Sequence, residues 1–206
     1  MALSSYAELQ ASVADWLSLS NATTQIVDFI ALAEADMNTT IRARQNTAYA
    51  TVTFASTGLA SLPEGYRSAR TLRLSGSPGY DLESVSLDRM SELLAGAGAG
   101  GNPEAFAVDG DSFRCFPTPS ADTDTICHYY RTIPALADDN TSNWVLAGYP
   151  QVYLFGALAH GFGWHDDTEN ERKYRTKFED AMKRLNAEGR EAYGDSATML
   201  MEATTP

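Results

Sequence analysis

The segment HGFGWHDD holds the residues of this sequence that come nearest to a metal-binding pattern. It contains His160, His165, Asp166 and Asp167, and imidazole with carboxylate is a usual ligand set for zinc or iron. The histidines are five residues apart rather than four, and the two glycines between them favour a helix end, so their rings would not converge on one helix face. We therefore interpret the segment as a helix C-terminus followed by an acidic cap for the next helix, and we expect neither a metal nor a cofactor.

A second candidate is the acidic pair Glu34 and Asp36, which is followed by Asn38. Glycoside hydrolysis needs two carboxylates that flank one bond. Residues at i and i+2 of a helix point about 200 degrees apart, so these two acids cannot do so together, although either could pair with a distant acid. We expect both to be solvated charges on a helix surface. A peptidoglycan-degrading enzyme is kept only as the least favoured alternative.

The sequence gives little support to nucleophilic catalysis. It contains no GxSxG elbow, and Cys115 has no signature that would pair it with a histidine. Cys115 and Cys127 lie in adjacent segments that resemble strands, and two thiols in a chain of this length are typical of buried apolar residues in a reducing compartment. We expect no catalytic residue.

The charge of the chain argues against a surface that holds nucleic acid. The formal net charge is -12, from 27 acids and 15 bases. Such a surface repels phosphates and anionic membranes. Several aromatic residues could stack on single strands, but in acidic surroundings we expect them to pack in the core and at a joint. They are Tyr129, Tyr130, Trp144, Tyr149 and Tyr153.

Helical periodicity occurs at both ends of the chain. Residues 1–46 predict a helical hairpin, with Ser4 or Ser5 as the first cap and a second helix from about Thr23. Its arms have apolar stripes at spacings of three and four. These stripes are Tyr6, Leu9, Val13 and Trp16 or Leu17, then Ile26, Ile30, Ala33, Met37 and Ile41.

The middle of the chain, residues 47–131, alternates with the period of strands. The expected strands are 47–55, 68–74, 104–108, 112–116 and 123–131, with a short helix at 87–95 and a glycine-rich loop at 96–101. Asp109-Gly110 predicts a hairpin turn. These segments indicate a small antiparallel β lobe.

Residues 132–193 begin with a joint and continue as helices. Pro134 ends the last strand, Asn143 can bond back to the backbone, and Trp144 is expected to insert into the core. These three residues are the predicted structural joint. A central helix from Pro150 and a last helix from about Thr168 to Tyr193 follow, and residues 194–206 are expected to be a flexible tail.

The expected fold is therefore α+β, with a helical bundle from the N- and C-terminal helices and an inserted small antiparallel β lobe. No run of 18 apolar residues occurs, and the N-terminus lacks the basic and apolar regions of an export signal. Neither membrane spanning nor export is expected.

Segments in a shared order resemble phage head-to-tail adaptors, also described as head-completion or tail accessory factors. The most distinctive is RTIPALADDNTSNWVLAGYPQVYLFGAL, and YAELQASVADWL, DFIALAEADMNTTIRAR, SLPEGYRSARTLRL and GGNPEAF agree in order. The similarity covers about residues 6–190. It implies a structural virion protein of the neck, between head and tail, which is present in the host cytoplasm during assembly.

The resemblance also implies partners. Family members join a ring, commonly of twelve copies, beneath the portal protein, and extend the DNA channel towards a downstream tail or nozzle protein. DNA would pass without specific binding. The C-terminal segment grips the portal, which in this chain places Tyr193, Met199, Leu200 and Met201 at the contact. The alternative is another neck or tail-completion protein, which would bind the lower ring.

Overall fold

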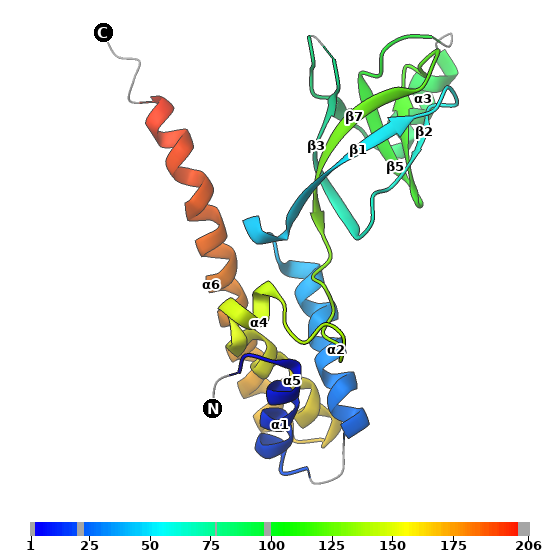
Figure 1. Cartoon of the computed structure of the whole chain (residues 1–206). Coiled ribbons are helices and arrows are strands. Elements are labelled where there is room, and N and C mark those ends of the chain that lie inside the picture. Colours follow the sequence, from blue (N-terminus) through cyan, green and yellow to red (C-terminus); the bar gives the residue numbers. More distant parts are fainter. Residues whose placement is uncertain (1–2, 20–22, 77, 97–99, 202–206) are drawn as a thin grey trace. The chain divides into compact units, whose positions relative to one another are not determined.

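The chain forms two compact units in the computed structural model, which describes residues 3–19, 23–76, 78–96 and 100–201. The helical unit comprises residues 1–46 and 133–206, and the β unit comprises residues 47–132 (Figure 1). The expected α+β class is confirmed. The boundaries expected from the sequence, at 46/47 and 131/132, differ from these by at most one residue.

Helices from both ends of the chain share the core of the helical unit. α5 is central to it, because successive residues such as Val152, Tyr153 and Leu154 are all buried. The apolar stripes expected on the N-terminal hairpin are buried here, with Leu17 rather than Trp16 on the inner face. The elements are α1 (Tyr6–Leu17), α2 (Thr23–Thr40), the short 3-10 helix η1 (Arg44–Asn46), α4 (Trp144–Gly148), α5 (Pro150–Trp164) and α6 (Thr168–Met201).

Local side chains set the start of α1. Ser5 is its N-cap, and the Ser5 hydroxyl accepts a hydrogen bond from the Glu8 backbone N–H at 3.3 Å. The Glu8 carboxylate in turn accepts from the Ser4 backbone N–H at 2.8 Å. These reciprocal bonds satisfy donors that a helix start otherwise leaves open, so the expected cap is confirmed.

Two glycines allow the other helices to approach α5 closely. A Cβ at Gly156 would lie 2.9 Å from the Ala33 Cβ and 3.0 Å from the Phe178 ring, and one at Gly161 would meet the Leu17 side chain. Both glycines lie inside α5, which ends at Trp164. Their function here is close helix packing, not chain reversal.

The last helix is longer than the sequence predicted. We expected it to end at Tyr193, but α6 continues to Met201. Gly194 is the only helix breaker in that stretch, and a single glycine costs a helix only about 1 kcal/mol relative to alanine. The predicted tail is therefore helical as far as Met201, and residues 202–206 lie outside the described residues.

The β unit contains two sheets that enclose a common core. β1, β7 and β3 form one antiparallel sheet, and the other has the order β2-β6-β5-β4, with β4 and β5 parallel. Apolar residues of both sheets, such as Phe54 and Phe113, meet between them. The strands are β1 (Thr47–Phe54), β2 (Leu59–Ser61), β3 (Tyr66–Leu74), β4 (Glu83–Ser84), β5 (Ala105–Asp109), β6 (Ser112–Phe116) and β7 (Thr123–Arg131).

A helix and a tight hairpin complete the β unit. α3 (Leu87–Gly96) packs Met90 against Ala105 and Ala107 of β5. The predicted hairpin joins β5 and β6, but Asp109 pairs with Ser112, so its loop is Gly110-Asp111 and lies one residue later than expected. Gly110 has φ +59, a conformation that glycine adopts without strain.

We predict that Gly156→Ala destabilises the helical unit. The added methyl would overpack the core and lower the free energy of unfolding by about 1–3 kcal/mol, while the higher helix propensity of alanine would raise it by about 1 kcal/mol. Gly148→Ala in α4 is the matched control, since a Cβ there meets nothing within 4 Å. Urea unfolding of both variants measures the difference. Equal stability would show that α2 and α6 do not limit the space around α5.

Candidate functional site

The residues of HGFGWHDD form a helix end, as the sequence predicted. α5 ends at Trp164, and Asp167 accepts a hydrogen bond from the Asn170 backbone N–H at 3.1 Å at the start of α6. A hydrogen bond from the Asn170 side chain lowers the pKa of Asp167, and this backbone bond lowers it further. His165 and Asp166 are exposed. In the parts of the chain that the structure describes, no group of three or more potential ligands could hold a metal ion.

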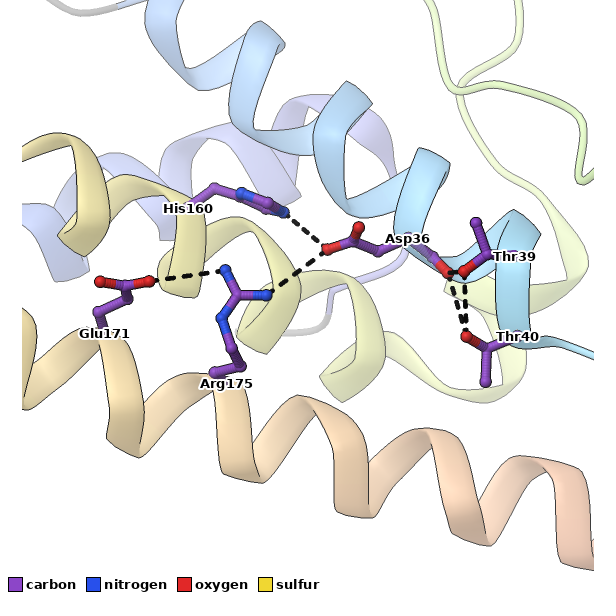
Figure 2. A network of polar contacts seen from close by, with 6 residues as sticks. All are labelled: Asp36, Thr39, Thr40, His160, Glu171 and Arg175. Carbon is purple, nitrogen blue, oxygen red and sulfur yellow. Dashed lines mark hydrogen bonds and ion pairs between the residues drawn. The ribbon is translucent and has the colours of Figure 1, made fainter.

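His160 belongs to a polar network that joins three helices (Figure 2). Its Nε2 lies 2.9 Å from Oδ2 of Asp36, and Arg175 approaches the same oxygen at 3.8 Å while contacting Glu171 at 3.7 Å. Asp36 thus connects α2 to α5 and α6. Because these groups are partly exposed, each ion pair contributes little to the stability of the fold, typically up to about 1 kcal/mol.

Glu34 contradicts the prediction that it is a solvated surface charge. Only 8% of it is exposed, and its Oε1 accepts hydrogen bonds from the Leu136 backbone N–H at 2.8 Å and the Tyr153 hydroxyl at 2.9 Å. Glu34 lies four residues after Ile30 and three before Met37, so it shares the buried stripe of α2. That spacing was the signal by which the sequence could have revealed it.

Asn143 connects this buried carboxylate to residues 132–143, between β7 and α4, which we call the joint segment. Its side-chain amide donates to the Tyr153 hydroxyl at 2.6 Å and to the Pro134 carbonyl at 2.8 Å. Its side-chain oxygen accepts from the Val145 and Leu146 backbone N–H groups, which caps α4. One side chain therefore starts a helix and closes the loop that precedes it.

The segment after the last strand is attached to α2 at two points. Asn38 accepts from the Ile133 backbone N–H at 2.8 Å, one helical turn from the bond between Glu34 and Leu136. The side chains of Ile133 and Leu136 are buried in the helical core. Residues 133–136 thus lie along α2, held by two polar bonds and two apolar anchors.

Trp144 contacts the core less deeply than we expected. It is only partly buried, whereas its neighbours Val145 and Leu146 are fully buried. Its Nε1 is shielded from solvent and has no hydrogen-bond partner within the described residues. The indole also lines a pocket of about 510 Å³ with Tyr149 and Arg184.

The other candidate residues do not form one site. Tyr129 is buried in the β unit, and Tyr153 is buried in the helical unit, so the aromatic residues serve separate cores. Burial raises the pKa of Cys115 to about 12 and that of Cys127 to about 11. Both are free, buried thiols, which confirms their interpretation as apolar core residues. Tyr193, Met199, Leu200 and Met201 lie beyond the described side chains of α6.

None of the helices within the described ranges combines the length and apolarity needed to cross a bilayer.

We predict that Glu34→Ala lowers the free energy of unfolding by about 3 kcal/mol, because the Leu136 N–H and the Tyr153 hydroxyl lose their acceptor. Glu34→Gln keeps an oxygen of similar reach and should cost about 1 kcal/mol or less. Urea unfolding compares the two. Equal losses would mean that the hydrogen bonds to Glu34 do not hold the joint segment.

The same residue should give the protein a pH-dependent stability. Burial raises the pKa of Glu34 above its ordinary value of 4.5, against the opposing effect of its two hydrogen bonds. The folded chain then holds the proton of the Glu34 carboxyl more tightly than the unfolded chain does. The stability gained from this difference is fully present below pH 4.5 and is lost as the pH rises through the raised pKa. The stability of the wild type relative to Glu34→Gln should therefore fall over that interval. Parallel pH profiles of unfolding would contradict the burial effect.

A comparison with known protein families gives one match, to the SU10 adaptor protein family, over residues 4–200. No curated protein matches the chain. The match includes the helical hairpin, the β unit, the joint segment and almost all of α6. It therefore covers nearly the whole chain. The chain therefore belongs to the SU10 adaptor protein family, a family of phage head-to-tail adaptors.

Proposed function

We propose that this protein binds the portal, forms a ring beneath it and extends the DNA channel to the tail. The observation that carries the proposal is the family match over residues 4–200. The ring would have the family's usual twelve copies, with α1, α2, α5 and α6 as the bundle of each copy. A downstream tail or nozzle protein would bind its lower side.

The length of α6 supports a role for its end in portal binding. Leu185 is the last of the described side chains of α6 in the helical core, and Asn186 contacts the end of α2 by accepting from the Arg42 N–H and donating to the Thr40 carbonyl. The helix then continues to Met201, about 22 Å further at 1.5 Å per residue. Figure 1 draws these last turns past the other helices of the unit.

Apolar residues in that extension suit a partner surface. Tyr193 and Leu200 are seven residues apart, so helical periodicity assigns them to the same face. Met199 and Met201 flank Leu200, and methionine adapts well to irregular surfaces. We propose these four residues as the portal contact.

The acidity of the chain fits a channel through which DNA moves. Lysine and arginine bind phosphates, and a net charge of -12 disfavours such adhesion. The protein would contact DNA only in passing, in the virion neck.

Assembly would depend on the portal. We expect a monomer in isolation and a ring only on the portal, whose surface would supply the contacts that α6 makes beyond the helical core. Light scattering of the protein alone and with the portal protein of the same phage tests this. The expected result is a monomer alone and a fixed number of copies on the portal.

Deletion of residues 194–206 should abolish portal binding while the helical core stays folded, because the described core side chains of α6 lie at or before Leu185. Leu200→Asp should weaken binding about tenfold or more, as is usual for an apolar contact residue. Thr198→Asp is its matched control, with the same new charge two residues away. A wild-type chain that ignores the portal would favour a different neck or tail-completion protein. Unchanged binding by the deletion variant would move the portal contact elsewhere.

A further inference from the structure

The outer face of α2 is apolar although it faces solvent. Val27 is 39% exposed and Leu32 is 49% exposed, and Ala31 and Ala35 are exposed beside them. The opposite face of α2 supplies the core residues. Asp28 is the charged residue of this outer stripe, which we call the α2 stripe: Val27, Asp28, Ala31, Leu32 and Ala35.

A groove lies between α5 and α6. Two pockets, of about 510 and 230 Å³, both have Gln151 and Arg184 in their linings, so they adjoin each other. Phe155 and the Lys177 stem line its inner part, with the ammonium 5.4 Å from the Phe155 ring centre. We call this the α6 groove: Gln151, Phe155, Lys177, Asp180, Ala181 and Arg184, with Trp144 and Tyr149 at one end.

The α6 groove and α2 lie on opposite sides of α6. Arg175 and Asn186 mark the side towards α2, through their contacts with Asp36 and the Arg42 backbone. At 100 degrees per residue, Lys177 and Arg184 point about half a turn away from that side. The outer face of α2 and the groove are therefore separate surfaces of one unit, and α5 lies between α2 and α6 in Figure 2.

The two surfaces carry individual groups of opposite charge. Residues 1–41 contain five acids and no lysine or arginine, and exposed Asp28 lies on the stripe. In the groove, no ion pair within the described residues involves Lys177 or Arg184. The nearby acid Asp180 is paired with Lys183 at 3.3 Å.

The Glu188 carboxylate, at the far end of the groove, accepts a hydrogen bond from the Tyr149 hydroxyl. Both acids of the groove thus have a local partner, whereas Lys177 and Arg184 are bases that could pair with an acid of a neighbouring copy.

We propose that the α2 stripe of one copy packs into the α6 groove of the next, with Asp28 facing Lys177 and Arg184. This inference rests on the proposed function, because it names the contact between neighbours in the ring. Since the two surfaces differ, the contact is heterologous, and repetition with a fixed rotation closes a ring. Leu32 and Val27 would cover Phe155 and the Lys177 stem.

The contact can be trapped without the portal. Copies labelled with ¹⁴N and ¹⁵N are mixed at high concentration and treated with a carbodiimide, which joins a carboxylate to an amine in contact with it. Mass spectrometry then identifies cross-links between copies. We expect cross-links from carboxylates of the N-terminal hairpin to Lys173 or Lys177. Their absence, or cross-links confined to other surfaces, would overturn the proposal.

Variants that leave both reactive groups in place test the surfaces themselves. Ala31→Arg in the α2 stripe and Arg184→Glu in the α6 groove should each reduce these cross-links roughly tenfold or more. Ala95→Arg, on an exposed position of α3 in the β unit, is the matched control and should change nothing. A mixture of Ala31→Arg and Arg184→Glu retains one intact pair of surfaces and should restore cross-links between unlike copies. Wild-type cross-linking by either variant would overturn the proposal.

A portal-binding measurement separates this inference from the proposed function. Ala31→Arg keeps the C-terminal segment, so it should bind the portal with fewer copies and less cooperativity than the wild type. Full cooperative filling by Ala31→Arg would overturn the proposed contact. Specific cross-links in a protein that never binds the portal would support the contact and reject the portal function.

Discussion

A buried carboxylate on the apolar side of α2 constrains the rest of the helical unit. An ionised group removed from water costs several kcal/mol unless hydrogen-bond donors replace the lost solvent. Glu34 meets that requirement with the Leu136 N–H and the Tyr153 hydroxyl, which come from the joint segment and from α5. The burial of one residue therefore determines where two distant parts of the chain must lie.

The other features of the unit are consistent with that arrangement. Asn143 caps α4 and donates to the Tyr153 hydroxyl, so the loop and the helix are positioned by the same side chain. Gly156 lets Ala33 and Phe178 approach α5, which is apolar all round and so must be covered by its neighbours. The polar bonds select the geometry, and apolar burial supplies most of the stability.

This construction suits a structural protein of the phage neck. Burial in the helical core explains the raised pKa of Glu34, and the helix cap at Asn170 explains the lowered pKa of Asp167. The charge is unevenly distributed: residues 1–41 contain five acids and no lysine or arginine, whereas α6 contains seven acids and seven bases. The proposed contact between copies and the proposed passage of DNA would both depend on this distribution of charge.

The sequence by itself determined the features that depend on neighbours along the chain. The periodic stripes, a cap at Ser4 or Ser5, an acidic cap after α5 and the main strands were all predicted, because their signals extend over only a few residues. Short elements such as α4 and β2 were missed, because a helix or strand of so few residues does not show a periodic pattern. The extent of α6 was underestimated because nothing in the sequence marks its end clearly.

Only the tertiary structure decided the partners of Glu34 and Asn143. Leu136 lies 102 residues from Glu34, and Tyr153 lies 119 residues from it. The spacing from Ile30 to Met37 could predict that Glu34 faces the core, but not what solvates it there. Which groups become hydrogen-bond partners depends on which distant segments pack together in the folded core. A periodic pattern along the chain contains no information about that packing.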